Sequence, residues 1–241
     1  MLTVITPTGD RPLAFSLCKR WMENQTHKPD QWIVIDDGKQ SMDLQSEGYL
    51  EYVRREPVKT DPKHTLVVNV ATAIPKIKGD KVIFWEDDEY YAPEFLEVMN
   101  HHLDKFQVVG IGWAKYYHIR TGGWVEHQNM NHASLAQTGF QMSVLSMVQM
   151  CIDRGMEKEW LDCQIWDETM KSKTTISHLI FRDERKPLYV GIKGLPGRNG
   201  IGIGHKIETY KNHDDKGRSK LISWVQKDYQ VYLNVLKEIG I

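Results

Sequence analysis

The stretch "KVIFWEDDEYYAPEFLE", Lys81 to Glu97, decides the fold. Its first five residues, Lys81–Trp85, are typical of a buried strand, and Pro93 lies near the start of a predicted helix. Between them stand three consecutive carboxylates, Glu86 to Asp88. Neighbouring carboxylates repel one another and raise one another's pKa. A divalent cation at this strand end would remove that repulsion.

The residues before this stretch alternate between strand and helix patterns. Leu2–Thr6 and Gln31–Gly38 read as short strands, and helical apolar spacing recurs at Leu66, Val70 and Ile74. Short strands alternating with helices predict a parallel, doubly wound sheet. The pattern becomes less regular in the second half, which ends in "KLISWVQKDYQVYLNVLKEIG", expected to be one amphipathic helix. No linker-like stretch separates the halves, so we expect one domain over residues 1–241.

Composition predicts an ordinary globular protein. The chain has 241 residues, of which 41% are hydrophobic and 26% charged. The sequence contains no run of about 18 apolar residues, so we expect no membrane-spanning helix. The strand pattern from Leu2 leaves no room for a leader. Three cysteines without metal-ligand spacing fit reduced thiols. We therefore expect a soluble, cytoplasmic protein.

Positive charge is concentrated late in the chain. Residues Lys171 to Lys220 hold 12 Lys/Arg against 5 Asp/Glu, although the formal net charge of the whole chain is -1. Such a segment can mark a face that meets phosphates. The alternative is a solvated region whose charges are balanced by neighbours. The sequence leaves both open.

Polar clusters follow three of the predicted strands. They are "TPTGDR" (Thr6–Arg11), "DDG" (Asp36–Gly38) and "EDD" (Glu86–Asp88). Ligands of an open α/β sheet bind outside the carboxyl ends of its strands, so these clusters should converge. Mg²⁺ and Mn²⁺ take carboxylate ligands and commonly also bind substrate phosphates. A metal site at "EDD" is one interpretation, and a solvated acidic turn is the other.

The first hundred residues resemble family 2-type glycosyltransferases with the GT-A fold. "MLTVITPTGDRPLAFSLCKRWMENQTHKPDQWIVIDDG" is similar to the family's opening strand, Pro-Thr turn, Arg-Pro helix start and Asp-Asp-Gly strand end. "NVATAIPKIKGDKVIFWEDDEYYAPEFLE" is similar to its Asn-initiated helix, acidic metal motif and following helix. The resemblance implies a Rossmann-like, mostly parallel sheet flanked by helices. Residues 1–110 would bind the nucleotide sugar, and residues 111–241 would form an irregular acceptor-side half.

The resemblance also implies roles for residues of the first half. Thr6, Pro7, Thr8 and Arg11 would lie against the nucleotide, and Asp36 and Asp37 would hydrogen-bond the uracil or ribose. Asp88 would bind a metal ion, Mn²⁺ or Mg²⁺, and Glu86 and Asp87 would contact the metal or the ribose. Glu86 departs from the aspartate that is common at its position, which leaves its direct ligation open.

Residues of the second half would complete the site. The family places its catalytic base at the start of a helix, which suggests Asp162 in "EKEWLDCQIWDETM" and Asp167 as second choice. Asp162 could instead serve only as an N-cap. His205 would bind the metal or touch the diphosphate, and Lys193 and Arg198 would bind the leaving diphosphate. The glycine-rich loop before His205 matches no phosphate-binding fingerprint.

The expected activity is metal-dependent, inverting transfer of a sugar from a nucleotide-diphosphate sugar, with UDP favoured. The acceptor would be a glycan or, as a second choice, a hydroxylated DNA base. A nucleotidyltransferase would normally carry a richer glycine loop than "TPTGDR" directly after its first strand. A non-catalytic nucleotide- or nucleic-acid-binding module is the third reading. The sequence does not identify the sugar, the acceptor or the oligomeric state.

Overall fold

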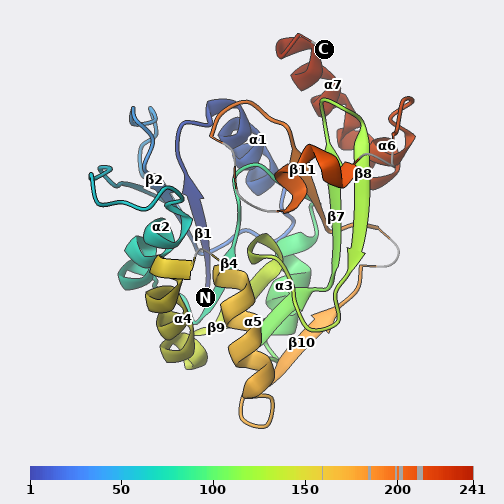
Figure 1. Ribbon diagram of the computed structural model, residues 1–241. Coiled ribbons are helices and arrows are strands. Elements are labelled where there is room, and N and C mark those ends of the chain that lie inside the picture. Colours follow the sequence, from blue (N-terminus) through green and yellow to red (C-terminus); the bar gives the residue numbers. More distant parts are fainter. Residues whose placement is uncertain (159, 184–185, 199, 201–202, 211–213, 241) are drawn as a thin grey trace.

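A seven-stranded sheet forms the centre of the molecule in the computed structural model, which describes residues 1–158, 160–183, 186–198, 200, 203–210 and 214–240 (Figure 1). Its strand order is β10-β6-β9-β4-β1-β2-β3. Of these seven strands, β9 alone runs antiparallel to its neighbours. The mostly parallel sheet predicted from the alternation of strands and helices is therefore confirmed. The strands are β1 (Leu2–Thr8), β2 (Gln31–Asp36), β3 (Leu50–Arg54), β4 (Lys81–Phe84), β6 (Val108–Ile111), β9 (Thr138–Gln141) and β10 (His178–Phe181).

A second, four-stranded sheet is built mainly from the second half of the chain. Its order is β5-β11-β7-β8, with β7 and β8 forming an antiparallel hairpin. Its short strand β5 directly follows the acidic turn, so this sheet places second-half residues beside the end of β4. The strands are β5 (Tyr90–Tyr91), β7 (Trp113–His118), β8 (Gly123–Gln128) and β11 (Tyr189–Lys193).

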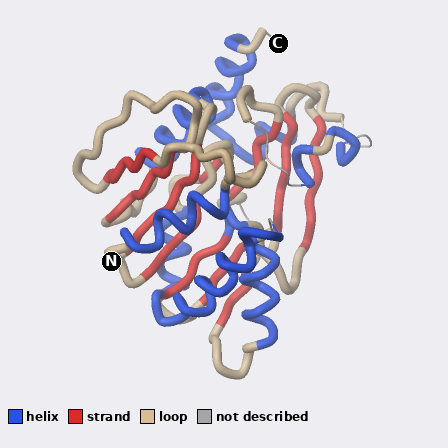
Figure 2. The backbone as a smooth tube through the Cα atoms, turned by 60° about the vertical axis from the view of Figure 1, so that its left-hand side comes forward, coloured by secondary structure: helices blue, strands red, loops and turns tan. Residues whose placement is uncertain are grey.

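Helices cover both faces of the central sheet, as the two views show (Figures 1 and 2). Val4, Val34 and Ile83 point into a core shared with α1, α3, α6 and α7, whereas Ile5 and Phe84 point into a core shared with α2, α4 and α5. This explains the nearly continuous apolar runs of these strands. The α-helices are α1 (Pro12–Glu23), α2 (Leu66–Ala73), α3 (Phe95–Leu103), α4 (Leu145–Lys158), α5 (Leu161–Lys171), α6 (Ser219–Val225) and α7 (Tyr229–Glu238). Short 3₁₀ helices are η1 (Ile74–Lys76), η2 (Leu135–Gln137), η3 (Met142–Val144), η4 (Ile203–His205), η5 (Ile207–Tyr210) and η6 (Gln226–Asp228).

The single closing helix expected from the sequence is wrong, because the chain breaks between α6 and α7. Gln226 has φ 50°, outside the helical region. Asp228, at the end of the break, accepts a hydrogen bond from the Tyr90 hydroxyl at 3.0 Å. After the turn, Tyr232 packs against the ring of Trp21 in α1. The apolar stripe is therefore divided between two helices that pack against the same core. Every helix in the described part of the chain is too short or too polar to cross a bilayer.

Candidate active site

The three polar clusters meet at the carboxyl edge of β1, β2 and β4. Thr8 pairs in register with Asp36, and Ile5 pairs with Phe84, two residues before Glu86. The Thr8 hydroxyl donates a hydrogen bond of 2.7 Å to Asp87, 79 residues later in the chain. The predicted convergence is thus present.

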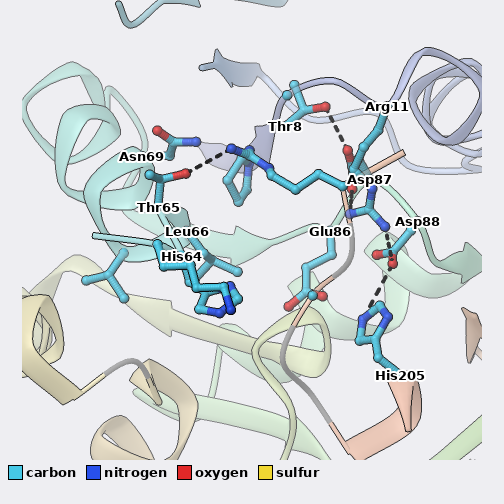
Figure 3. A pocket seen from close by; sticks show the side chains of 16 residues that line it. Thr8, Arg11, His64, Thr65, Leu66, Asn69, Glu86, Asp87, Asp88 and His205 are labelled. Carbon is cyan, nitrogen blue, oxygen red and sulfur yellow. Dashed lines mark hydrogen bonds and ion pairs between the residues drawn. The ribbon is translucent and has the colours of Figure 1, made fainter. Parts of the chain in front are cut away.

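Arg11 explains how the acidic turn tolerates its charges. It lies just before α1, and its guanidinium donates to Asp87 at 2.7 Å and to Asp88 at 2.5 Å (Figure 3). Both carboxylates are buried. Charge-assisted bonds of this kind are the strong ones, and the guanidinium fork presents two donors at a fixed spacing. In this structure Arg11 is the direct counter-ion of Asp87 and Asp88.

Asp88 and His205 face each other in the protonation states that suit a metal. Burial acts to raise the pKa of Asp88, but the charges of Arg11 and Lys193 outweigh it and hold that pKa below its usual range. Burial, and next the charge of Lys193, lower the pKa of His205 to about 3. Its Nε2 lies 3.9 Å from Oδ2 of Asp88 (Figure 3). An ionised carboxylate and a neutral imidazole are the forms that bind cations.

The carboxylates of Glu86 and Glu89 lie beside that of Asp88, and Glu89 was not among the site residues predicted from the sequence. Oxygens of Glu86, Asp88 and Glu89 all lie within 4.8 Å of one another. Glu89 accepts a hydrogen bond from the backbone N–H of Ile192 at 2.8 Å and pairs with the ammonium of Lys193. Burial raises its pKa to about 7. Its position directly after "EDD" could have identified it as a fourth acid of the same turn.

Glu86 is the least compensated member of this acidic cluster, which we define as Glu86, Asp87, Asp88 and Glu89. Its side chain points away from Arg11 (Figure 3), and among the described residues none donates a hydrogen bond to its carboxylate. Burial, and next the charge of Glu89, raise its pKa to about 8. When ionised, the four carboxylates face two permanent cations, Arg11 and Lys193, which leaves two negative charges in excess. The donor set fits one hard divalent cation.

Two cavities meet at the acidic cluster. The smaller, about 130 Å³, is bounded by the end of β1 and the start of α2, with Pro7, Thr8, Asn69 and Arg198 in its wall. The larger, about 380 Å³, lies toward the second sheet and α5. Both include Leu66, Glu86, Gly200 and His205 in their walls. A molecule in one cavity would therefore meet a molecule in the other beside Glu86.

The sequence model described as "Glycosyl transferase family 2" matches residues 3–162, more than half of the chain. The chain belongs to glycosyl transferase family 2. No curated protein matches it. The family 2 membership and the GT-A architecture predicted from the first hundred residues are thereby confirmed.

Solved structures with the same fold include TarS and a mannosyltransferase. TarS from S. aureus, residues 1–349 in complex with UDP, has a TM-score of 0.56 and 18% identity, and the match covers 79% of this chain and 60% of that one. The mannosyltransferase PcManGT from Pyrobaculum calidifontis, in complex with GDP-Man and Mn²⁺, has a TM-score of 0.55 and 15% identity over 82% of this chain and 58% of that one. This family 2 chain thus spans about 58 to 60% of the length of these relatives.

Asp36 and Asp37, the acid pair matched to the family 2 motif, have different surroundings. Asp36 is fully buried and accepts hydrogen bonds from the backbone N–H groups of Gly38 and Met42 and from the Tyr52 hydroxyl at 2.8 to 3.0 Å. It is absent from the walls of both cavities. This carboxylate therefore shapes the loop after β2.

Asp37 instead joins the two halves of the family 2 fold. It accepts a bond of 2.8 Å from Arg55 and one of 2.5 Å from Arg198, a wall residue of the smaller cavity. Burial acts to raise its pKa, but hydrogen bonds from Arg198, Thr65 and Arg55 lower it overall. Gly9 is required beside it, since a Cβ there would lie 2.4 Å from the Asp37 carboxylate. Asp37 is also absent from the walls of both cavities, but its bond to Arg198 links it to the smaller one. Contact with the nucleobase remains a prediction for both acids.

Thr6 and Lys193 have internal partners in the structure. The Thr6 hydroxyl is buried and accepts a bond of 2.8 Å from the Trp32 indole. Lys193 is 4% exposed and binds Glu89, with Asp88 at 3.6 Å. Their predicted contacts with the donor stay predictions, whereas Pro7 and Thr8 do line the smaller cavity.

Asp162 and Asp167, the two candidate catalytic bases, have different surroundings in the structure. Asp162 lies in the first turn of α5 and lines the larger cavity. Asp167 lies on the same helix, but it is exposed and is absent from the walls of both cavities. Asp162 therefore has the position that a base would need.

Five of the twelve cations in the basic segment, residues 171–220, pair with acids outside it. Lys193, Arg198 and Lys220 pair with acids that lie outside the segment. So do Lys171, which pairs with Glu168, and Lys186, which pairs with Glu94. Arg185 and Lys211 lie outside the described residues. The structure therefore supports charge balance by neighbours for these five cations.

Proposed function

We propose that this chain transfers a sugar from a nucleotide-diphosphate sugar, with UDP favoured, to an acceptor hydroxyl with inversion at the anomeric carbon. The carrying observation is that the acidic cluster and His205 lie where the two cavities meet, with Asp162 in the wall of the larger one. The neighbours TarS and PcManGT, bound to UDP and to GDP-Man with Mn²⁺, support a nucleotide-sugar donor.

The donor would occupy the smaller cavity. Thr8 and Pro7 come from β1, Asn69 from α2 and Arg198 from the loop after β11. Lys63 and His64 also contribute to this wall. Cationic and N–H-rich walls suit a diphosphate. The sugar would then extend past Glu86 into the larger cavity.

Asp88 would hold the divalent metal, Mn²⁺ or Mg²⁺, with Glu86, Glu89 and His205 as further candidate ligands. The imidazole favours Mn²⁺, since Mg²⁺ prefers an all-oxygen shell. When bound, such an ion offsets the negative charge that develops on the diphosphate. Arg11 would hold Asp87 and Asp88 in place for this role, and its charge favours the ionised form of Asp88.

Asp162 would act as the general base. The acceptor oxygen forms a bond to the anomeric carbon, its proton passes to the Asp162 carboxylate, and the bond from that carbon to the diphosphate oxygen breaks. The electron pair of the broken bond stays on the diphosphate, where Arg198 in the wall of the smaller cavity would meet its charge. Attack from the larger cavity with departure toward the smaller one inverts the configuration.

A glycan is the favoured acceptor. Tyr116, Trp160 and Tyr189 contribute aromatic rings to the larger cavity, and Trp160 is 45% exposed. Aromatic faces suit the apolar face of a sugar ring. A hydroxylated DNA base is the second candidate, but five of the twelve cations in the basic segment that would support it pair with acids elsewhere in the fold. The expected cytoplasmic location remains a prediction.

Release of UDP or GDP from nucleotide sugars, with water as acceptor, tests the proposal. Mass spectrometry should detect hydrolysis of at least one of UDP-glucose, UDP-GlcNAc and GDP-mannose with Mn²⁺, and excess EDTA should abolish it. Asp88→Asn should lower the rate by roughly 100-fold or more, because a metal ligand is lost while the shape is kept. Asp80→Asn, at an exposed position, is the matched control. Full activity in EDTA would refute the metal assignment.

A further inference from the structure

His132 faces the proposed base across the wall of the larger cavity. Its Nε2 lies 3.3 Å from Oδ2 of Asp162, and both residues line that cavity. His132 comes from the segment between β8 and η2, whereas Asp162 comes from α5. Both side chains are only partly exposed, so solvent alone does not set their orientation.

The packing of α5 fixes one side of this pair. Trp166 lies one turn after Asp162, and its indole N–H donates a bond of 3.0 Å to the Thr138 hydroxyl of β9. Its ring lies over Gly110 of β6, where an added Cβ would come within 2.4 Å of it. Since residues four apart share a helix face, anchoring Trp166 also sets the position of Asp162.

The packing of the neighbouring segment fixes the other side. Ala133, directly after His132, is fully buried, and its Cβ would lie 2.6 Å from a Cβ at Gly110. Ser134 donates to the Gln137 side chain at 2.9 Å, and its carbonyl accepts from Thr138 at 2.8 Å. The absence of a side chain at Gly110 thus lets Trp166 and Ala133 pack on β6, which brings their neighbours Asp162 and His132 together.

We propose that His132 is the positioning residue of the base. A small rotation of the imidazole from its present ion-pair contact would let Nε2–H donate to Oδ2 of Asp162, which would leave the other carboxylate oxygen to accept the proton of the acceptor hydroxyl. A base must be within hydrogen-bond reach and correctly oriented before its pKa matters. The inference rests on the proposed function, because it assigns a partner to the residue named there as base.

Substitutions that put an amide N–H in place of one ring nitrogen distinguish positioning of Asp162 by His132 from a loss of packing around His132. His132→Gln carries an amide N–H near the place of Nε2, whereas His132→Asn carries it near the place of Nδ1. Hydrolysis of the best donor should lose roughly 10- to 100-fold in kcat in His132→Ala and His132→Asn, with donor KM little changed. His132→Gln should recover most of that loss. His101→Ala, an exposed histidine in α3, is the matched control.

Asp162→Asn distinguishes failure of this inference from failure of the proposed function. If Asp162→Asn keeps the wild-type rate, the base assignment itself is wrong. If Asp162→Asn is inactive while His132→Ala is fully active, only the positioning role is wrong. Adding His132→Ala to Asp162→Asn should cause no further loss, since the two residues act as one unit. Equal losses in His132→Gln and His132→Ala would also overturn the inference.

A spectroscopic measurement tests the same contact without activity. Long-range ¹H–¹⁵N spectra of the whole protein at pH 8 should show the His132 ring, identified by its absence in His132→Gln, with its proton on Nε2. The Nδ1–H form would contradict the proposal, because Nε2 faces Asp162 and could not then donate to it.

Discussion

At the scale of single residues, the site depends on which carboxylates already have partners. Asp87 and Asp88 are held by Arg11, and Asp36 by the loop after β2. A carboxylate that accepts several bonds from its own chain also stabilises the fold, because removing it leaves buried donors unpaired. Glu86 accepts no hydrogen bond from a described residue, so its carboxylate is the one left for a ligand, whereas Asp37 could act through Arg198 in the wall of the smaller cavity.

Asp37 and Asp36 should therefore respond differently to substitution. Asp37→Asn should weaken UDP binding by roughly 10- to 150-fold, the equivalent of one hydrogen bond to a charged group. Asp36→Asn should instead lower the free energy of unfolding by about 1–3 kcal/mol, because its buried donors lose an ionised acceptor. Calorimetric titration of UDP and thermal unfolding measure the two effects. UDP binding that is unchanged in Asp37→Asn would remove the nucleobase assignment.

At the scale of elements, the turn between β4 and β5 concentrates charge, and its stability should depend on pH and metal together. Burial raises the pKa values of Glu86 and Glu89 to about 8 and about 7, from an ordinary value of 4.5. Between pH 4.5 and 8 these two glutamates therefore bind more protons in the folded state than in the unfolded state. Its stability from these groups is present below the unfolded pKa and is lost as pH rises through the folded values.

Mn²⁺ should stabilise the protein more at pH 8 than at pH 6. At pH 6 the two glutamates hold protons that compete with the metal, and at pH 8 that competition has largely ended. Thermal unfolding with and without Mn²⁺ at both pH values measures the difference. Glu86→Gln should reduce the pH dependence of the shift. An equal shift in melting temperature at both values would contradict this account.

The contact between α5 and β6 can be tested through Gly110. Gly110→Ala should destabilise the protein by about 1–3 kcal/mol, because the new Cβ would meet both Trp166 and Ala133. It should also lower kcat, because it displaces Asp162 relative to His132. Gly217→Ala is the control, since nothing lies within 4 Å of its added Cβ. Denaturant unfolding and donor hydrolysis, measured together, show whether the two losses coincide.

At the scale of the whole molecule, the distribution of charge bears on the acceptor. Lys220 pairs with Glu126 at 2.7 Å and lies over the rings of Trp124 and Trp224, and Arg218 donates to the carbonyl of Ile119. These cations hold the second sheet against α6. They are therefore poorly placed to be exchanged for backbone phosphates of a nucleic acid.

Binding of duplex DNA should accordingly be weak and nearly independent of salt. Five phosphate contacts would give a slope of about -4 to -5 in the logarithm of affinity against the logarithm of salt concentration. We expect a much shallower slope, measured by fluorescence anisotropy from about 50 mM salt upward. Lys173→Ala with Lys206→Ala changes cations of the segment without touching the pairs of Lys220 and Arg218. A steep slope that this variant softens would favour DNA over a glycan.

The sequence by itself determined the alternation of strands and helices, the edge at which three polar clusters converge and the helix start that carries Asp162. These features are local, because periodicity, turn residues and helix-start residues act over a few positions. Tertiary structure alone decided that Arg11 neutralises the acidic turn, that Glu89 and Lys193 complete it, and that Asp36 is buried by its own loop. It also decided that β9 enters the sheet antiparallel, that the closing helix divides at Gln226, and that His132 meets Asp162. Those outcomes join residues far apart in the chain, and only the packing of elements around one core brings such residues within hydrogen-bond distance.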